Sequence, residues 1–405
     1  MRRRTLLQSL LSAPVVWPLA GQVLAETEDI SGLRVVVVGA GAFGGWTALA
    51  LQQRGARVTL LEAHAAGHPR ASSGGETRVI RHMYRDAREV RMAARSLALW
   101  KQAEQEWGER LLHASGVLFM RQPEGRAFFA AADAAMAAAG VDYQTLDPAE
   151  LAARWPQIRL AGIEQAAFEP QSGYLLARRG CHAVVEAFRR AGGDYRIAAV
   201  SPEPVRDGRM AAVALNDGSR IPADRIVFAC GPWLPALFPE LLADHLKTSR
   251  QEVFYFGTPP GDRLHNESAL PVWADFGPTL WYGIPGSERR GFKLADDSHG
   301  PEIDPERADR IASKAGIEAA RAYVAQRFRA LADAPLIDAR VCQYTNTPDG
   351  AFILDRHPEA ANVWLLGGGS GHGFKHGPAL GELAAASVIA DQVMEPGFAL
   401  ARLGI

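Results

Sequence analysis

The chain has 405 residues, 48% of them hydrophobic, and its 44 lysine and arginine residues are balanced by 45 aspartate and glutamate residues. This length and apolar content predict two or three domains rather than one small domain. The balanced charge argues against a nucleic-acid surface, and no repeat or low-complexity tract indicates an array or a disordered chain.

Residues 1–25 have the pattern of an export signal. A basic start precedes a modestly apolar run, and small residues at positions 23–25 form a cleavage pattern. The segment RRTLL, which begins at Arg3, resembles a twin-arginine signal. Pro14 and Pro18 interrupt the apolar run and disfavour a membrane-spanning helix. We therefore expect a periplasmic mature protein; the alternative is a chance basic start on a cytosolic one.

The strongest local signal follows this segment. A strand, a helix and a second strand are predicted in that order, at residues 33–38, 42–54 and 57–61. Gly39, Gly41 and Gly44 form a G-x-G-x-x-G turn, which lets a pyrophosphate approach the N–H groups at the start of the helix. Glu62 ends the second strand, where an acidic residue would bond a ribose hydroxyl. The motif predicts a dinucleotide site without separating FAD from NAD, and Glu62 argues against NADP.

The remaining pattern predicts a second domain inserted into the first. Aromatic, strand-like segments between Gln251 and Leu294 predict an antiparallel sheet. The chain then returns to a buried strand, a glycine-rich loop and a closing helix after Asn362. We predict a discontinuous nucleotide-binding domain at residues 32–112, 170–245 and 336–395, and a substrate domain at residues 113–169 and 246–335.

The three cysteines do not indicate a disulfide framework. Cys181 shares a helical face with Val184 and Phe188, which is a core position, and Cys230 closes an apolar strand. Cys342 lies in the segment CQYT beside polar and β-branched residues. From its surroundings alone it is either a buried strand thiol or an attachment point.

Seven segments match one family in order and spacing. They are GAGAFGG, SSGGETRVIRH, RWP, FEPQSGYL, YGIPGSERRGFKL, CQYTNTPDGAFILD and GSGHGFKHGPALGE. On these motifs the chain resembles the monomeric sarcosine oxidase and N-methyltryptophan oxidase group of D-amino-acid oxidase-like flavoenzymes. The resemblance covers nearly all of the mature chain. It implies an α/β flavoprotein of two domains, in which an FAD-binding Rossmann-like domain carries an inserted antiparallel-sheet substrate domain.

The resemblance also implies the cofactor, FAD, and its attachment. The cysteine of the family's C-x-Y-T motif forms a thioether to the methyl carbon on the flavin's benzenoid ring, and it matches Cys342. A nearby cation favours the thiolate, and Arg78 or Arg340 is the candidate donor of that charge. The residues expected to contact the cofactor are Gly39, Gly41, Gly44, Glu62, Thr77, Cys342, Gly371, His372, Gly373 and Phe374.

Two arginines and a lysine match the family's carboxylate-binding region. Arg78 and Arg81 lie three residues apart, which places them on one helical side or together in a compact loop. By resemblance Arg78 lies near the flavin, while Arg81 and Lys375 hold the substrate carboxylate. A solvated basic loop is the alternative. His372 and His376 also stand four apart, but no third metal ligand is apparent, so we predict no metal site.

Lys293 matches the family lysine that activates dioxygen over the flavin. It ends an apolar strand, so an exposed strand-end lysine is the alternative. Tyr282 and Tyr344 match the tyrosines that line the family's substrate pocket, although either residue alone fits a core position.

Two positions depart from the family pattern. Gly74 stands where sarcosine oxidases carry a histidine, and a count from Lys293 places Asp297 where they carry a second pocket histidine, with His299 nearby. We expect both departures to open the pocket and to change its charge. They favour a bulkier or cationic secondary amine over sarcosine, with Asp297 among the substrate-binding residues.

The sequence therefore predicts a monomeric FAD-dependent oxidase that converts a secondary or N-alkylated amino acid to an imine and reduces dioxygen to hydrogen peroxide. One alternative is a dehydrogenase of the same fold that passes electrons to a quinone or a carrier protein. Another is a flavin-binding protein without catalytic activity, against which the retained arginines and lysines argue. The expected partners are small molecules, with no nucleic acid and no membrane span.

Overall fold

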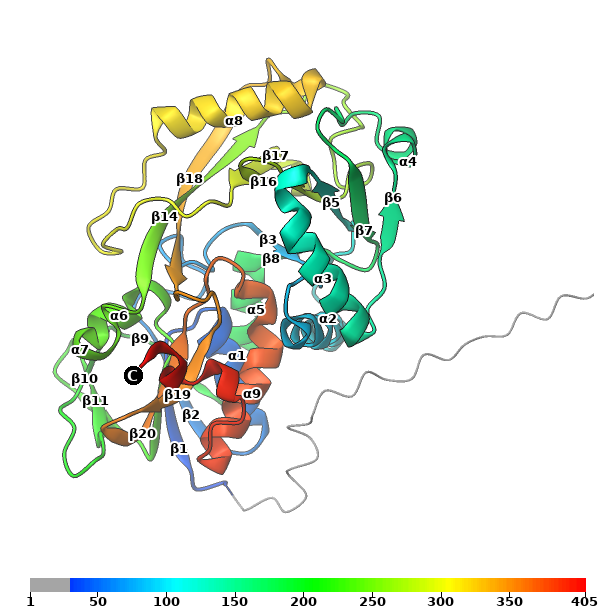
Figure 1. Ribbon diagram of the computed structural model, residues 1–405. Coiled ribbons are helices and arrows are strands. Elements are labelled where there is room, and N and C mark those ends of the chain that lie inside the picture. Colours follow the sequence, from blue (N-terminus) through cyan, green and yellow to red (C-terminus); the bar gives the residue numbers. More distant parts are fainter. Residues whose placement is uncertain (1–29) are drawn as a thin grey trace, which may run out of the picture.

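The computed structural model describes residues 30–405, so the predicted export signal lies outside the described residues. Two large sheets dominate the molecule, and they lie at opposite ends in Figure 1. The six-stranded sheet carries the nucleotide-binding motif, and the eight-stranded sheet belongs to the aromatic-rich segments. No helix within residues 30–405 is long and apolar enough to cross a membrane.

The six-stranded sheet has β1 near its centre, in the order β19-β20-β13-β1-β2-β9. All its pairings are parallel except that of β19 with β20. The strands are β1 (Arg34–Val38), β2 (Arg57–Glu62), β9 (Asp194–Ile197), β13 (Arg225–Phe228), β19 (Ile353–His357) and β20 (Ala360–Gly367). The four valines of β1 are all buried, as expected for a parallel strand covered on both faces.

Helices cover one face of this sheet and meet beside its central strands (Figure 1). They are α1 (Ala42–Gln53), α2 (Ala87–Trp107), α5 (Ala177–Arg190) and α9 (Gly377–Ala390). Asp86 caps α2 by accepting a hydrogen bond from the Arg88 N–H, and Gly108 ends it in the left-handed conformation. The helix predicted at residues 42–54 is confirmed to within one residue.

The turn between β1 and α1 tolerates no side chain at two of its glycines. Gly39 has a φ of +101°, and a Cβ there would lie 2.5 Å from the Ala229 carbonyl oxygen. A Cβ at Gly44 would lie 1.9 Å from the Gly39 carbonyl oxygen. By contrast, a Cβ at Gly41 would meet Ser73 Oγ at 3.4 Å and nothing closer. The first and last glycines therefore permit the tight turn, while Gly41 leaves space above it.

The eight-stranded sheet is mixed rather than purely antiparallel, in the order β18-β14-β17-β16-β15-β5-β7-β6. Its strands are β5 (Val117–Arg121), β6 (Gln144–Leu146), β7 (Gln165–Glu169), β14 (Lys247–Phe256), β15 (Val272–Phe276), β16 (Leu280–Ile284), β17 (Phe292–Asp296) and β18 (Leu336–Asn346). The pairing of β15 with β5 is parallel, because the two strands come from separate insertions rather than from one hairpin. Helices α3 (Arg126–Ala139), α4 (Pro148–Arg154) and α8 (Lys314–Arg327) pack around this sheet.

Strand β18 connects the two halves of the molecule. Residues 336–346, which the sequence analysis placed in the nucleotide-binding domain, pair with β14 along the edge of the eight-stranded sheet. At its far end the Thr345 carbonyl oxygen accepts a hydrogen bond of 2.9 Å from the Ser370 N–H, in the glycine-rich loop before α9. Cys342 therefore lies on a strand of the second sheet that runs up to the first.

A small sheet lies between the two large ones. It consists of β4 (Leu112–His113), β8 (Gly173–Leu176) and β3 (Thr77–Ile80), with β8 in the middle. Of the two alternatives for Arg78 and Arg81, a shared helical side is excluded, because Arg78 lies on strand β3 and Arg81 directly follows its end. A further small sheet, of β10 (Val200–Pro202), β11 (Ala212–Leu215) and β12 (Arg220–Pro222), packs beyond the six-stranded sheet, near short helices α6 (Leu234–Leu237) and α7 (Pro239–Leu242).

Candidate active site

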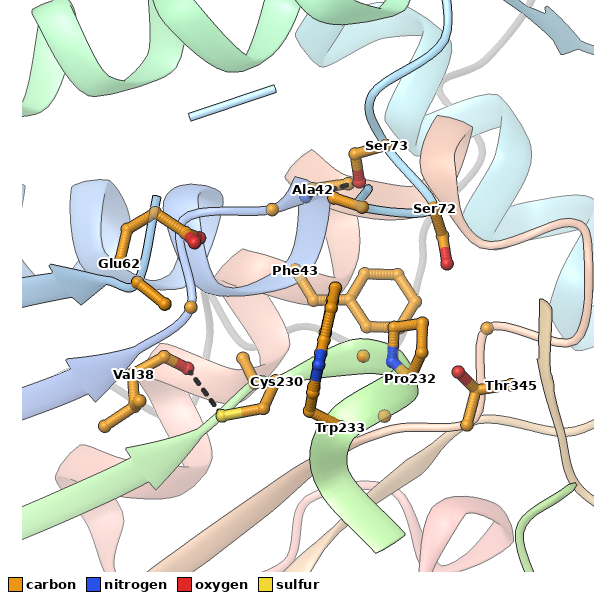
Figure 2. Close-up of a pocket in the computed structure, with 18 of the residues that line it drawn as sticks. Val38, Ala42, Phe43, Glu62, Ser72, Ser73, Cys230, Pro232, Trp233 and Thr345 are labelled. Carbon is orange, nitrogen blue, oxygen red and sulfur yellow. Dashed lines mark hydrogen bonds between the residues drawn. The ribbon is translucent and has the colours of Figure 1, made fainter. Parts of the chain in front are cut away.

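A cavity of about 330 Å³ opens at the carboxyl ends of β1 and β2. Its lining comes from the glycine turn, the loop of residues 71–73, the segment after β13 and the glycine-rich loop before α9. Figure 2 shows side chains from these segments around it, among them Glu62, Ser73 and Trp233. Of the residues predicted to contact the cofactor, Gly39, Gly41, Glu62, Gly371, Gly373 and Phe374 line it.

Glu62 anchors the turn at the floor of this cavity. Its Oε2 accepts a hydrogen bond of 2.9 Å from the Ala40 N–H, and its Oε1 accepts one of 3.2 Å from the His64 N–H. Burial raises the pKa of Glu62, and these hydrogen bonds partly offset that effect. The carboxylate therefore stays close to the ribose position expected in this fold while it holds the backbone of the glycine turn.

The first turn of α1 faces the same cavity. Ser73 Oγ accepts a hydrogen bond of 3.2 Å from the Ala42 N–H, and Ala42 and Phe43 both line the cavity (Figure 2). Unpaired N–H groups and the positive end of a helix dipole favour a phosphate at such a position. The glycine turn, the helix start and Glu62 together fit the pyrophosphate and ribose of a dinucleotide.

Three further residues interact at the rim of this cavity, and none of them was predicted from the sequence. Arg70 Nη2 donates a hydrogen bond of 2.6 Å to Glu306 Oε2, and Trp233 Nε1 donates to the other carboxylate oxygen of Glu306. Glu306 and Trp233 line the cavity. Glu306 comes from a loop after β17, so no local pattern in the sequence indicated its approach to Arg70.

Arg78 lies at the inner end of the large cavity. Its guanidinium donates to the Thr77 and Ser72 carbonyl oxygens at 2.8 and 2.6 Å, and its Nη2 lies 3.4 Å from Cys342 Sγ. Arg340, the other candidate for this charge, instead pairs with Glu76 and the neighbouring Asp338. The cation beside the thiol is therefore Arg78.

Lys293 is buried, which excludes the exposed strand-end lysine considered from the sequence. It is the second residue of β17 rather than its end, and only 2% of its surface is exposed. Its Nζ donates a hydrogen bond of 2.9 Å to the Thr77 carbonyl oxygen and lies 3.4 Å from Thr77 Oγ1. Burial, and then the charge of Arg78, hold the pKa of Lys293 well below its usual range.

A second cavity, of about 90 Å³, adjoins the first. The two cavities share Arg78, Tyr344, Gly371 and Phe374 in their linings. Apolar side chains from the eight-stranded sheet form most of the remaining wall, and its polar members are Arg81, Tyr282, Asp297, His372 and Lys375. The structure thus brings all the residues predicted to bind substrate into one small chamber beside the larger cavity.

Tyr84 lies behind the basic side of this chamber, where it contacts two of the lining residues, and it was not predicted from the sequence. Lys375 Nζ donates hydrogen bonds of 2.8 Å to Tyr84 Oη and 2.7 Å to the His372 carbonyl oxygen. The Arg81 guanidinium lies 4.1 Å from the centre of the Tyr84 ring, and it donates to the Met83 carbonyl oxygen. One buried tyrosine therefore positions both cations.

The two histidines of the glycine-rich loop have separate partners. His372 Nε2 lies 3.0 Å from the Gly350 carbonyl oxygen, and His376 Nε2 lies 2.9 Å from Tyr84 Oη. Burial lowers the pKa of His372 to about 3, so the ring is neutral. Within residues 30–405 no group of three His, Cys, Asp or Glu side chains is placed to hold a metal ion.

A buried carboxylate supports the turn that carries Arg81. Glu169 accepts hydrogen bonds of 2.8 Å from the His82 and Met83 N–H groups, and it also bonds the His82 ring and the Ser172 hydroxyl. These bonds fix the backbone between Arg81 and Tyr84. The segment FEPQSGYL contains both Glu169 and Ser172, but its role became visible only with the contacts.

Four predicted residues lie just behind the cavity walls. Cys342, Thr77 and Lys293 line neither cavity but contact residues that do, namely Arg78 and Tyr282. Gly44 lies under the turn, within the first helix. Gly74 packs against the His68 carbonyl oxygen, where a Cβ would lie at 1.9 Å, so a larger residue would require a different loop path.

The comparisons with known proteins agree with this arrangement. Residues 34–387 match the family described as DAO, FAD dependent oxidoreductase, and the chain belongs to that family. It is 31% identical over 354 residues to peroxisomal sarcosine oxidase of Homo sapiens, covering 86% of this chain and 90% of that protein. It is 28% identical over 356 residues to N-methyl-L-tryptophan oxidase of Yersinia pestis, covering 87% and 93%. The predicted family and the prediction of an FAD-dependent amine oxidoreductase are confirmed.

Solved structures share the fold. L-proline dehydrogenase from P. horikoshii superimposes with a TM-score of 0.80 at 22% identity, over 92% of this chain and 98% of that one. Amadoriase I from Aspergillus fumigatus gives a TM-score of 0.76 at 21% identity, over 93% and 91%. The predicted two-domain flavoprotein fold is confirmed.

The basic side of the chamber predicts a pH dependence. Burial, and then the charge of Arg81, hold the pKa of Lys375 well below its usual range. Affinity for acetate, measured from changes in flavin absorbance, should therefore fall as the pH rises through this lowered pKa. Lys375→Arg should retain binding to higher pH, because guanidinium stays charged, and Lys375→Met should remove the dependence. An unchanged profile in Lys375→Met would contradict this assignment; Lys314→Met, at an exposed position on α8, is the control.

Proposed function

We propose that the protein oxidises a secondary or N-alkylated amino acid to an imine and passes the electrons to dioxygen, which yields hydrogen peroxide. The observation that carries this proposal is the meeting of Arg81 and Lys375 around Tyr84, in a chamber that shares Arg78 and Tyr344 with the cofactor-sized cavity. Its relatives include proteins named for oxidation of sarcosine and N-methyl-L-tryptophan, both N-methylated amino acids.

Arg81 and Lys375 would hold the substrate carboxylate. A guanidinium and an ammonium group supply charge-assisted hydrogen bonds to both carboxylate oxygens. The apolar wall opposite them, which includes Phe119 and Phe276, excludes water from the rest of the substrate. Bound in this way, the amine-bearing carbon would point toward the shared wall of the two cavities.

The same cations favour the reactive form of the substrate amine. An ammonium ion near Arg78, Arg81 and Lys375 is destabilised by like charge, so its pKa falls and the neutral amine with its free lone pair predominates. FAD held in the large cavity would supply the acceptor for the hydride equivalent, two electrons and one proton, that leaves the carbon beside this amine, and the N–H proton would be released to solvent. Water then hydrolyses the imine without the participation of a protein group.

Lys293 is the candidate for the oxygen half-reaction. Its Nζ lies beside Thr77 and Tyr282, buried and without a carboxylate partner among the described residues. A fixed positive charge near the cofactor stabilises the superoxide anion that forms first from dioxygen. Because dioxygen itself is neutral, the benefit appears mainly in the transition state.

Cys342 is the candidate for covalent attachment of FAD through a thioether. Its thiol is free, and Arg78 Nη2 lies 3.4 Å from its sulfur, which is the atom that a thioether to a ring methyl carbon requires. Tyr344, two residues along the same strand, lines both cavities, so this face of β18 points toward them.

A dehydrogenase that passes electrons to a quinone or a carrier protein is the second candidate. The likeness to a structure named L-proline dehydrogenase, with a TM-score of 0.80, supports this second candidate. Yield of hydrogen peroxide per imine separates the two: a yield near one supports the oxidase, and a yield near zero with rapid reduction of an artificial acceptor supports the dehydrogenase.

We further propose a monomeric, periplasmic protein exported in its folded state. Support comes from the twin-arginine-like RRTLL segment and from a relative named monomeric sarcosine oxidase. Export requires both arginines of such a signal. Replacement of Arg3 and Arg4 by lysine should therefore leave the protein inside the cell, and unchanged export would contradict the proposal.

Covalent attachment predicts that the flavin stays with the protein after acid denaturation. Acid-precipitated wild-type protein should stay yellow, because the flavin remains bonded to Cys342. Cys342→Ser lacks the nucleophilic sulfur and should release the flavin to the supernatant. Cys230→Ser, which removes a second thiol at the cavity, is the matched control and should remain yellow. Colourless precipitate from fully loaded wild type would rule out the attachment.

The oxygen half-reaction predicts a specific defect in Lys293→Met. Methionine keeps the length of the side chain and removes its charge, so reoxidation by dioxygen should slow by at least about a hundredfold. Flavin reduction by substrate under anaerobic conditions should change much less. Stopped-flow absorbance measures the two half-reactions separately.

Lys314→Met again serves as the control for loss of a lysine far from the site. Reoxidation of Lys293→Met at the wild-type rate would show that this lysine has a structural role only, and it would favour the dehydrogenase.

A further inference from the structure

We infer that Asp297 selects substrates that carry a second cationic group, so the preferred amino acid has a basic side chain. This inference rests on the proposed function and names the substrate class of the same chamber. It starts from the composition of the chamber wall. Of the residues that line it within the described chain, Asp297 is the one carboxylate, and the other charged members are Arg78, Arg81 and Lys375.

The Asp297 carboxylate is not paired with the cations of the chamber. Neither Arg81 nor Lys375 forms an ion pair with it among the described residues, because Arg81 donates to the Met83 carbonyl oxygen and Lys375 to Tyr84 Oη. The two cations thus remain available for the substrate carboxylate. Neutralisation of Arg81 and Lys375 therefore does not account for the presence of a carboxylate at position 297.

One oxygen of Asp297 is fixed and the other is free. Tyr344 Oη donates a hydrogen bond of 3.0 Å to Asp297 Oδ1, and the Asp297 N–H donates one of 2.8 Å to the Leu280 carbonyl oxygen. Oδ2 has no hydrogen bond or ion pair within residues 30–405. The side chain is therefore oriented by Tyr344 while half of its accepting capacity is left for a ligand.

The position of Asp297 corresponds to the outer end of a bound substrate. Asp297 is half-buried and directly follows β17, and the next two residues, Ser298 and His299, are exposed. Lys375, by contrast, is buried with 4% of its surface exposed. A substrate whose carboxylate reaches Lys375 would therefore extend its side chain toward Asp297 and the rim.

The chemistry of such a site favours a cation over a neutral group. An ionised carboxylate that is partly removed from water is stabilised most by an ammonium or guanidinium group, which supplies charge-assisted hydrogen bonds. Most of the remaining lining is apolar, including Leu280 and Phe276, and it suits the methylene stem of a basic side chain. An N-alkylated amino acid with a basic side chain matches all three parts of the chamber: its carboxylate suits Arg81 and Lys375, its methylene stem suits the apolar lining, and its cationic group suits Asp297.

The test compares two substrates of equal length that differ at the far end. They are α-N-methyl-L-lysine and N-methyl-L-2-aminoheptanoic acid, whose side chain carries a methyl group at the position of the ammonium group. The wild-type kcat/KM should favour the lysine derivative by about ten- to hundredfold, the worth of one charge-assisted hydrogen bond. In Asp297→Asn the ratio should fall to about one, whatever the change in absolute rate.

Two further variants distinguish loss of the Asp297 charge from a general disturbance of the fold. Asp296→Asn alters the neighbouring carboxylate, which caps the Ser298 N–H outside the chamber, and it should keep the wild-type ratio. Tyr344→Phe removes the hydroxyl that orients Asp297 and should give an intermediate ratio.

The outcomes distinguish this inference from the proposed function. Reduction of the flavin by neither amine, nor by any other secondary amino acid, would contradict the proposed function itself. A wild-type ratio near one, or a ratio that Asp297→Asn leaves intact, would overturn the role of Asp297 while the proposed function stands.

Discussion

Four basic side chains without carboxylate partners among the described residues, two of them buried lysines and two of them partly buried arginines, are the constraint on which this site depends. Among the described residues, Arg78, Arg81, Lys293 and Lys375 all bond to neutral oxygens, from backbone carbonyls or from hydroxyl groups. Removing a charge from water without an opposite charge is costly, and proteins retain such groups mainly where function requires them. The unbalanced positive charge is directed at the two joined cavities. It suits a substrate carboxylate in one and the negative charge that arises on a reduced cofactor in the other.

The fold satisfies this constraint with a few backbone positions between the two sheets. The Thr77 carbonyl oxygen accepts from both Arg78 and Lys293, although these residues belong to different sheets. Tyr84 plays the same part for Lys375 and stacks beneath Arg81. The short sheet that contains β3 therefore connects the cofactor half to the substrate half chemically as well as spatially. A displacement of this sheet would disturb binding of substrate carboxylate and reoxidation together.

Local pattern was sufficient to predict the nucleotide-binding half. The strand, glycine turn and helix at residues 34–53 follow from apolar runs and from glycine spacing, which are properties of neighbouring residues. The second sheet was predicted less well, because the pairing of β5 with β15 and of β18 with β14 joins segments far apart in the chain. Period and propensity carry no information about such partners.

The site residues differ in the same way between those that the sequence indicates and those that depend on distant partners. Arg81, Lys375 and Asp297 were found through resemblance and spacing, and they do line one chamber. Tyr84, Glu169 and Glu306 were missed, since a buried tyrosine or glutamate looks like any other until its partners are known. The spacing of Arg78 and Arg81 left a helical side and a compact loop as alternatives, and it did not indicate that the pairing of β3 with β8 places Arg78 on a strand.

The central claim is that the unpaired cations bind a carboxylate so that its neighbouring amine is oxidised. Anaerobic bleaching of the flavin by N-methyl-L-norleucine and by N-methylpentylamine, which lacks only the carboxylate, tests it most directly. The account predicts bleaching by the amino acid at a concentration at least about tenfold lower than the amine requires, since the amine cannot engage Arg81 and Lys375. Equal bleaching by the two compounds, or none by either, would contradict it.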